Sequence, residues 1–409
     1  MRILMLAQSY SPVVGGEERI VEDLSRELVR RGHEVVVATL AQPAGEPPRD
    51  SGVEVELLGS GLDRLPGLSG DPERRYAPPA PDPVTVRDLR RLLQRWRPDV
   101  VHGHNWLVDA YLPLDSRDGP AFVLSLHDYS LRCATKRFFY RGAVCSGPAA
   151  RKCLAHAVEH YGAAKGAATA LGTAVCERWL RRRVDLFLPV SEAVRELNSL
   201  GTAPSRVIPN FIGELPPSPA VAPELERLPE GPFALYFGDV TEDKGVGKLV
   251  EAYAGLEGAP PLVLVGRPLL ELPAVPGVVA LGRLPHPLAI EALRRSQFTV
   301  APTLLPESFG IVALEAAAAG KPAIVSAIGG LTDVVRDGET GLLVRPGDVT
   351  ALRTALRRLF ADAELRQRLG EAARRRALEF SPDVVVPQFE AAYRAALDSR
   401  LKKRGGSGR

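Results

Sequence analysis

The first 39 residues hold an apolar segment, a longer mixed segment and a second apolar segment, an order that strongly constrains the fold. Residues 3–7 predict a buried strand. Residues 17–31 predict a helix that ends in a basic turn followed by Gly32, because basic residues and a glycine favour a helix C-terminus. Residues 33–39 predict the next strand. This strand–helix–strand start indicates a doubly wound α/β domain, in which ligands bind at the carboxyl ends of the strands.

The length of the chain predicts two domains. At 409 residues it is too long for one ordinary core, and two domains of about 200 residues each are expected. The proline-rich stretch 216–232 is typical of an interdomain linker. Residues 233–237 after it predict the first strand of a second α/β domain. We therefore expect an N-terminal domain over residues 1–212 and a C-terminal domain over residues 213–383.

Composition limits the class of protein. Hydrophobic residues make up 45% of the chain and charged residues 25%, which is typical of a soluble globular protein. A net charge of +3 does not require a nucleic-acid partner. No run of 18 apolar residues occurs, so we expect no transmembrane helix. Residues 2–7 are too short for a signal peptide, and four cysteines without an export signal indicate a reducing cytoplasm.

Two glutamates, Glu307 and Glu315, stand eight positions apart on either side of Gly310. Gly310 fits a loop-to-helix junction, and residues 311–319 predict a buried helix with almost no polar face. Free backbone N–H groups at such a helix start form a ready phosphate site. A carboxylate near the end of an apolar helix is rarely buried without a partner, which draws attention to Glu315. The spacing alone also allows Glu307 to be a helix cap and Glu315 to lie at a solvated edge.

The stretch from Glu307 to Glu315, with Phe309 and Gly310 inside it, resembles the E-x7-E motif of retaining glycosyltransferases of family 4. Residues 320–325 and 337–344 continue the pattern of that family. The resemblance implies the GT-B fold, in which two Rossmann-like doubly wound domains face each other across a cleft.

The same resemblance assigns roles to residues of the C-terminal domain. It implies that Glu307 approaches the donor sugar, that Glu315 holds the ribose of the nucleotide, and that backbone amides after Phe309 hold phosphate. In this fold the final helix, about residues 384–401, packs back on the N-terminal domain, and we expect a disordered tail over residues 402–409. The implied donor-binding residues are Gly16, Gly238, Lys244, Arg267, Phe309, Gly310, Ile311 and Glu315.

The N-terminal domain carries the acceptor side of the resemblance. Gly15-Gly16 does not match G-x-G-x-x-G, and no acidic residue is placed for a dinucleotide ribose, which disfavours an NAD site. These glycines resemble the family loop whose backbone approaches the donor phosphate, and a simple tight turn is the alternative. His127 follows the predicted strand 122–126 and resembles the cleft histidine that contacts the donor sugar, although a lone histidine is more often structural. The implied acceptor-binding residues are Gly15, Gly16 and His127, and the implied catalytic residues are His127, Lys244 and Glu307.

Residues 238–245 resemble the family loop G-R-L-x-x-x-K-G, whose arginine and lysine neutralise the departing diphosphate. Lys244 matches this pattern, but Asp239 stands where the arginine is usual. A carboxylate beside a diphosphate is repulsive, so we expect Asp239 to turn away. Lys244 then carries the positive charge alone or together with Arg267. The alternative for Lys244 is an ordinary surface lysine at a helix start.

The sequence offers two histidines as candidate metal ligands. His102 and His104 alternate through Gly103, so their side chains point to one side of the predicted strand. No third ligand is evident, which disfavours a metal site there. No D-x-D pair occurs in a suitable loop. We therefore expect no catalytic metal and no cofactor besides the sugar nucleotide that serves as donor.

Three cysteines cluster in the N-terminal half, at Cys133, Cys145 and Cys153. Together with His156 they could bind zinc, but their spacing lacks the C-x2-C pairs of ordinary structural zinc sites. We favour a loop with semi-buried thiols. Their role does not follow from the sequence.

Residues 130–183 form the most basic segment of the chain. They hold eleven Lys or Arg residues against two Glu residues, a local net charge of +9, with aromatic residues between them. Such a segment suits an anionic membrane surface or a lipid-phosphate acceptor. It would also suit RNA, but no nucleic-acid motif accompanies it, and a solvated basic face is the third alternative. We expect peripheral contact with the inner face of a membrane and no nucleic-acid partner.

These features predict a retaining glycosyltransferase that moves a hexosyl group from a nucleotide diphosphate sugar to a hydroxyl acceptor. The acceptor would be a glycan, a lipid-linked molecule or a small molecule, in bacterial glycan, glycolipid or natural-product glycoside synthesis. The leaving diphosphate would take the proton of the acceptor, so positive side chains and helix dipoles would replace a metal. One alternative is an epimerase or hydrolase on the same fold that uses His102 or His104. Another is a non-catalytic sugar-nucleotide-binding subunit, which the departure at Asp239 would permit.

Overall fold

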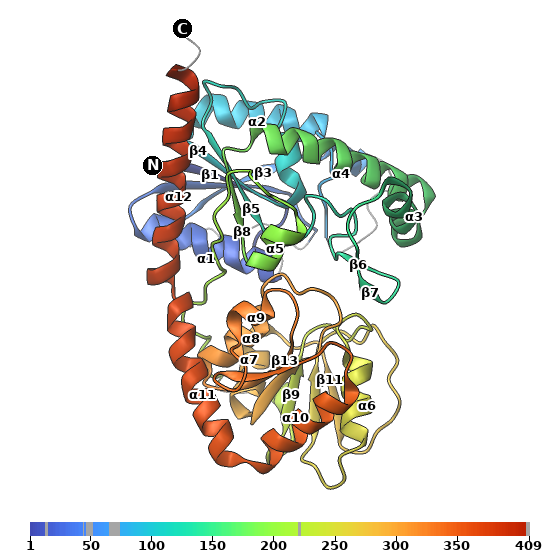
Figure 1. Cartoon of the computed structure of the whole chain (residues 1–409). Coiled ribbons are helices and arrows are strands. Elements are labelled where there is room, and N and C mark those ends of the chain that lie inside the picture. Colours follow the sequence, from blue (N-terminus) through green and yellow to red (C-terminus); the bar gives the residue numbers. More distant parts are fainter. Residues whose placement is uncertain (13–14, 44, 46–51, 65–73, 220–221, 406–409) are drawn as a thin grey trace. The chain divides into compact units, whose positions relative to one another are not determined.

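The computed structural model describes residues 1–12, 15–43, 45, 52–64, 74–219 and 222–405 (Figure 1). The chain forms two compact units, and each is described by itself. The first unit comprises Met1–Phe138, Cys145–Pro209 and Val385–Arg409, and the second comprises Phe139–Val144 and Asn210–Val384.

The first unit is built on a six-stranded parallel sheet in the order β3-β2-β1-β4-β5-β8. This order is that of a doubly wound dinucleotide-fold sheet, as the start of the sequence predicts. The central strands β1, β4 and β5 are almost entirely buried, because helices cover both faces of such a sheet. The strands are β1 (Arg2–Ala7), β2 (Glu34–Leu40), β3 (Glu54–Leu58), β4 (Val100–His104), β5 (Ala121–Leu126) and β8 (Leu186–Pro189).

Local sequence signals fix the helices of the first unit. The first helix ends at Arg30, and Gly32 follows it in a left-handed conformation (φ +84°), as the basic last turn and the glycine predict. The second begins after Asp82, whose carboxylate accepts hydrogen bonds from the amides of Val84 and Thr85. The helices are α1 (Gly16–Arg30), η1 (Gly61–Arg64), α2 (Pro83–Trp96), η2 (Asn105–Ala110), α3 (Ala150–Tyr161), α4 (Ala163–Arg183), α5 (Glu192–Leu197) and most of α12 (Pro382–Gly405).

The second unit repeats the same architecture. Its parallel sheet has the order β11-β10-β9-β12-β13-β14, and apolar clusters pack against its strands. The strands are β9 (Ala234–Phe237), β10 (Leu262–Val265), β11 (Val278–Gly282), β12 (Phe298–Ala301), β13 (Ala323–Ser326) and β14 (Gly341–Val344). The helices are η3 (Pro223–Leu225), α6 (Val246–Ala254), α7 (His286–Arg295), α8 (Ile311–Ala318), α9 (Leu331–Val334), α10 (Val349–Ala361), α11 (Ala363–Ala377) and η4 (Leu378–Phe380). A short hairpin pairs β6 (Phe139–Tyr140) with β7 (Ala143–Val144).

Helix α12 extends further than the sequence predicts. We expected disorder from residue 402, but the helix continues to Gly405. Ion pairs within the first unit hold its last turns: the Arg400 guanidinium lies 2.7 Å from the buried Asp115 carboxylate, and Lys403 Nζ lies 2.8 Å from that of Asp185. Residues 406–409 lie outside the described part of the chain.

The basic segment 130–183 is largely helical. Helices α3 and α4 pack closely as a hairpin, since a Cβ atom on Gly166 of α4 would lie 2.3 Å from the carbonyl oxygen of Ala157 in α3. Cys133 and Cys145 lie outside helices, as expected for a loop. Cys153 lies in α3, because residues 150–161 form a helix and not the expected loop. No helix among the described residues is long and apolar enough to cross a membrane.

Candidate functional site

The expected donor residues other than Gly16 gather at the carboxyl edge of the sheet in the second unit. Gly238 directly follows β9, and Gly266 and Arg267 directly follow β10, which pairs with β9. The two loops touch, because a Cβ atom on Gly266 would lie 1.7 Å from the carbonyl oxygen of Gly238. Glycine is therefore required for this close approach. Parallel α/β sheets bind their ligands at this edge.

Lys244 and Glu307 form an ion pair in this region. Lys244 Nζ donates a hydrogen bond of 2.6 Å to Glu307 Oε2, and both side chains are about one-third exposed or less. Lys244 stands in the loop before α6, and Glu307 stands in the loop between β12 and α8. Two residues 63 positions apart are thus brought together by the strand order, and Lys244 is more than an isolated surface lysine.

Asp239 is paired with Arg267. The guanidinium donates two hydrogen bonds to the carboxylate, Nε to Oδ1 at 3.0 Å and Nη2 to Oδ2 at 2.6 Å. These hydrogen bonds lower the pKa of Asp239 below its usual value. We expected Asp239 to turn away from a bound diphosphate, and in the structure its carboxylate is paired with Arg267. A guanidinium from the neighbouring loop therefore lies beside the position at which the family pattern has its arginine.

Helix α8 begins at the glutamate motif without a side-chain cap. Its N-cap is Gly310 in a left-handed conformation (φ +98°), where a Cβ atom would lie 2.5 Å from the Leu331 side chain. The Phe309 side chain is buried and packs on Phe380, with ring centroids 5.8 Å apart. The alternative in which Glu307 caps the helix is therefore wrong. The first amides of α8, including that of Ile311, have no carbonyl partner within the helix and can bind an anion.

Glu315 is buried, with 1% of the residue exposed, so the alternative of a solvated edge is also wrong. His286 Nε2, from the first turn of α7, donates a hydrogen bond of 2.7 Å to Glu315 Oε1. Sequence reasoning missed His286. The signal that could have pointed to it was the burial expected for Glu315, since a buried carboxylate needs a partner.

In the first unit, the expected acceptor-side residues lie at the carboxyl edge of its sheet. Gly15 is the N-cap of α1 in extended conformation, and Gly16 opens the helix. Glu17 follows them and accepts a hydrogen bond from the side chain of Asn105, which in turn accepts one from the backbone amide of Gln8 at 3.3 Å. Burial raises the pKa of Glu17 to about 8, and the carboxylates of Glu18 and Asp128 raise it further. Sequence reasoning did not single out Glu17.

Three histidines meet at the ends of β4 and β5. The rings of His102 and His104 lie 4.1 Å apart between centroids, which confirms that both point to one side of the strand. His104 Nδ1 and His127 Nε2 share a hydrogen bond of 2.9 Å. His102 shares hydrogen bonds with the Tyr393 hydroxyl (2.9 Å) and the Ser125 hydroxyl (2.8 Å). Burial lowers the pKa of His102 to about 3 and that of His127 to about 4, so these rings are neutral at physiological pH.

This arrangement does not favour a metal at the histidines, because both ring nitrogens of His102 already have hydrogen-bond partners in the protein. Across the described ranges, no group of three or more His, Cys, Asp or Glu residues is placed to hold a metal ion. The cysteines are free thiols with other contacts: Cys145 Sγ donates to the Gly147 carbonyl at 3.6 Å, and Cys153 Sγ accepts from the Ala149 amide at 3.4 Å.

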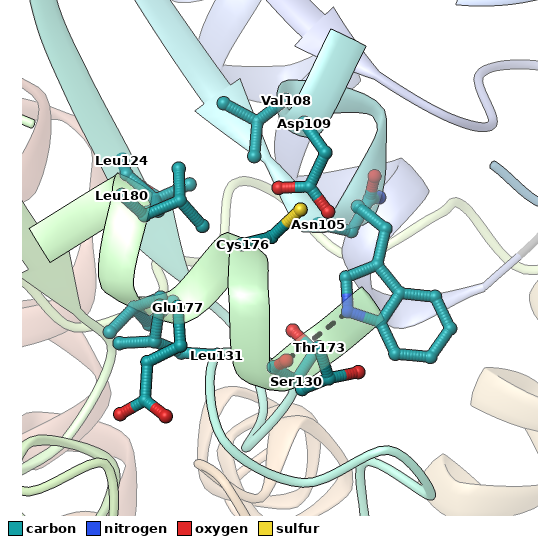
Figure 2. Close-up of a pocket in the computed structure, with 13 residues that line it drawn as sticks. Asn105, Val108, Asp109, Leu124, Ser130, Leu131, Thr173, Cys176, Glu177 and Leu180 are labelled. Atoms are coloured by element: carbon teal, nitrogen blue, oxygen red, sulfur yellow. Dashed lines mark hydrogen bonds between the residues drawn. The ribbon is translucent and has the colours of Figure 1, made fainter. Parts of the chain in front are cut away.

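A small cavity lies elsewhere in the first unit, between η2, β5 and α4 (Figure 2). Its volume of about 20 Å³ is roughly that needed for one water molecule. It is therefore too small for a sugar or a nucleotide. Figure 2 shows the sulfur of Cys176 beside the buried carboxyl group of Asp109.

The chain matches two family profiles that together span most of its length. Residues 15–210 match the glycosyl transferase 4-like domain, and residues 221–376 match the glycosyl transferases group 1. The chain is 32% identical to a glycogen synthase of Mycobacterium tuberculosis over 429 aligned positions, covering 97% of this chain and 95% of the relative.

Solved structures resemble the whole chain. A sucrose-phosphate synthase from Thermosynechococcus elongatus superposes with a TM-score of 0.71 at 22% identity, covering 96% of this chain and 98% of that one. HepE of Anabaena, in complex with UDP-glucose, superposes with a TM-score of 0.68 at 18% identity, covering 96% and 99%. At these identities the likeness shows the fold, which is GT-B.

Proposed function

This chain belongs to the group 1 glycosyltransferases, and from that premise we propose that it is a retaining, metal-independent hexosyltransferase. It would transfer the sugar of a nucleotide diphosphate sugar to a hydroxyl group of a glycan, a lipid-linked molecule or a small molecule. Proteins similar to this chain are named for glycogen and sucrose-phosphate synthesis, so glucosyl donors are the first to test.

The observation that carries this proposal is the grouping of two cations at the sheet edge of the second unit. Lys244 is held by Glu307, and Arg267 is held by Asp239. The start of α8 adds amides that can bind phosphate. These groups would neutralise the charge that develops on a departing diphosphate, the task that a metal performs in other enzymes.

The reaction then proceeds on one face of the sugar. The bond between C1 and the diphosphate oxygen breaks, and the electron pair leaves with the diphosphate. The bond between C1 and the acceptor oxygen forms on the same face, and the acceptor proton passes to a phosphate oxygen of the leaving group. Glu307 would contact the sugar and Glu315 the ribose, while His127 would contact the sugar from the first unit.

The alternative functions have less support. An epimerase or hydrolase would need His102 or His104 as acid or base, but both residues are 0% exposed and held neutral by burial. The non-catalytic alternative depends on Asp239 at the usual arginine position, and the pairing of Asp239 with Arg267 supports a compensated site instead.

Turnover by the purified full-length protein tests the proposal. UDP-, ADP-, GDP- and TDP-glucose are each incubated with sugar, inositol and lipid acceptors, with and without EDTA. We expect an α-linked product from an α-linked donor by proton NMR, with a rate that EDTA leaves unchanged. A β-linked product would disprove retention, and loss of rate with EDTA that Mg²⁺ restores would disprove metal independence.

We also propose that the α3–α4 hairpin contacts an anionic membrane surface, which would place the enzyme peripherally at a membrane. Leu171 (68% exposed) and Val175 (50%) lie one turn apart on the outer side of α4. The exposed Arg178 and Arg182 continue that side of the helix, so apolar and basic side chains are adjacent. This combination favours anionic lipid.

Vesicle flotation tests the membrane contact. We expect the full-length protein to float with vesicles that contain phosphatidylglycerol and not with vesicles of phosphatidylcholine, and salt should weaken the binding. Arg178→Gln/Arg182→Gln should reduce flotation severalfold, whereas the matched change of Arg357 and Arg358 on α10 should not. Equal flotation of the two double variants would disprove this surface.

A further inference from the structure

The hydrogen bond between His104 and His127 joins a wholly buried residue to one that the proposed function places at the sugar. His104 ends β4, His127 follows β5, and the two strands pair in register with His104 opposite Ser125. The rings are nearly parallel, with an interplanar angle of 21° and centroids 5.2 Å apart. His104 Nδ1 and His127 Nε2 form the hydrogen bond. Each ring therefore has one further nitrogen, His104 Nε2 and His127 Nδ1.

The protonation of these two outer nitrogens is coupled. Burial keeps both rings neutral, lowering the pKa of His127 to about 4 and that of His104 well below its usual value. A neutral imidazole carries one N–H donor and one acceptor nitrogen. Because the two rings share one hydrogen bond, only one of them donates it. Consequently one outer nitrogen carries a proton and the other carries a lone pair.

The surroundings decide which ring donates. Neither His104 Nε2 nor His127 Nδ1 has a hydrogen-bond partner among the described residues. His104 is 0% exposed, so an N–H group at its Nε2 would lack an acceptor among the described residues and would be shielded from solvent. His127 as a residue is less buried than His104 and stands at the sheet edge, so a ligand can reach its Nδ1, which is covered in this structure, once the ring edge turns outward. Buried orphan N–H groups are rarer and costlier than orphan acceptors.

The His104 ring is fixed from its other side as well. The His102 ring lies 4.1 Å from it between centroids. His102 is itself held by hydrogen bonds with Tyr393 of α12 and Ser125 of β5. His104 therefore sits between a fixed ring and His127, which limits its reorientation.

We infer that His104 is a positioning residue that fixes the tautomer of His127. His104 Nδ1–H donates to His127 Nε2, and His127 is left with its proton on Nδ1. It thus presents an N–H donor, suited to a hydroxyl or ring oxygen of the sugar, and not an acceptor. The assignment of the sugar as its partner rests on the proposed function, whereas the tautomer itself does not.

Nitrogen NMR of the full-length protein, labelled with ¹⁵N-histidine, reads the tautomers directly. The chain has seven histidines, so the spectrum can be assigned by removing single residues, with His127→Gln identifying the His127 signals. We expect His104 and His127 both to be protonated at Nδ1 and unprotonated at Nε2 at neutral pH. A His127 signal protonated at Nε2 would overturn the inference, and the tautomers themselves are read in the unaltered protein.

Two substitutions add a functional readout. The amide of Asn can donate from about the position of His Nδ1, so His104→Asn should keep the His127 tautomer and keep kcat/KM within about threefold. His104→Leu removes the donor and should lower kcat/KM for the donor sugar by roughly three- to tenfold, the value of one hydrogen bond. Thermal unfolding of both variants separates lost stability from lost positioning. Equal kcat/KM for the Asn and Leu variants would overturn the positioning role.

The outcomes separate this inference from the proposed function. If His127 has the expected tautomer but His127→Gln leaves transfer unchanged, His104 still fixes the ring and the sugar contact assigned to His127 is wrong. If transfer fails in every assay but the tautomer is as expected, only the proposed function fails.

Discussion

Asp239 and Arg267 form a two-bond ion pair across the ends of β9 and β10, with N–O distances of 3.0 and 2.6 Å. We propose that Arg267 takes the place of the arginine that the Lys244 loop would carry in the family pattern. A carboxylate next to a bound diphosphate is unfavourable, but a carboxylate that orients a guanidinium presents net zero charge and leaves further N–H donors of the arginine available. The pair therefore keeps a planar donor group at the sheet edge.

This pairing predicts unequal effects of removing its two members. Arg267→Ala leaves the Asp239 carboxylate uncompensated near the diphosphate, so kcat should fall by about 10²-fold, as for other groups that stabilise developing charge. Asp239→Asn keeps the arginine, so it should lower kcat by less than tenfold. The double variant should recover part of the loss of Arg267→Ala, measured as kcat at saturating donor. Equal losses in the two single variants would contradict this account.

The sequence predicts the doubly wound architecture and the members of the expected donor site better than it predicts their partners. Lys244, Glu307 and Arg267 were named from motifs and strand ends, and the structure brings them to one sheet edge. The pairing of Asp239 with Arg267 could not be predicted, because it depends on which strand lies beside β9. Sequence reasoning missed His286 for a similar reason, because His286 stands 29 positions before Glu315 and no motif links the two residues.

The same limit applied to His127. Its position at a strand end was predicted, but its bond with His104 depends on the adjacency of β4 and β5 and on side-chain orientation. Glu17 was missed because its environment, and not its spacing, distinguishes it from an ordinary helix-start glutamate.

The Lys244–Glu307 pair predicts a large effect on catalysis. Lys244→Ala removes positive charge from the expected diphosphate position and should lower kcat by about 10²–10³-fold. Lys248→Ala is a matched control, because Lys248 pairs with Glu251 at 3.0 Å on the exposed surface of α6, one turn further along the chain. Its kcat should stay within about twofold of the wild type, since exposed ion pairs contribute little. Similar losses of kcat in both variants would show that Lys244 has no specific role in catalysis.

The buried Glu315 predicts the nucleotide-binding behaviour. Isothermal titration with UDP, ADP, GDP and TDP should give tight binding of one nucleotide, and Glu315→Ala should weaken it by roughly 10- to 100-fold, as expected for a hydrogen bond to a charged group. Glu339→Ala, a change at an exposed glutamate of the same unit, should leave binding unchanged. Binding of none of the four nucleotides would contradict the proposed donor site.

His286 predicts a separate effect on stability. His286→Ala leaves the buried Glu315 carboxylate without its 2.7 Å hydrogen bond and should lower the free energy of unfolding by about 1–3 kcal/mol. Glu315→Gln keeps a hydrogen-bonding group at that position and should lower the free energy of unfolding by a smaller amount. Urea unfolding followed by circular dichroism measures both. A smaller loss for His286→Ala than for Glu315→Gln would show that the histidine does not support the carboxylate.

Asp109 predicts how stability depends on pH. It is 1% exposed beside Cys176 in the cavity of Figure 2, and burial raises its pKa to about 8. In the unfolded chain an aspartate loses its proton near pH 4. Between these values the folded state holds a proton that the unfolded state has released. The contribution of Asp109 to the free energy of unfolding therefore falls by about 1.4 kcal/mol for each pH unit of increase.

Asp109→Asn removes this titration and should make the protein relatively more stable as pH rises. The three buried histidines, whose pKa values are lowered, change stability only below about pH 6.5, so the test uses the window from pH 6.5 to 8. Glu17, whose pKa is also raised to about 8, contributes equally to the variant and the wild type, so the difference between the two proteins isolates Asp109. Across that window the stability difference between Asp109→Asn and wild type should grow by roughly 1–2 kcal/mol. Thr173→Val, which alters the same cavity without a titrating group, should shift stability equally at both pH values. A constant difference for Asp109→Asn would mean that Asp109 is ionised in the folded protein, so that its neighbours stabilise a buried charge.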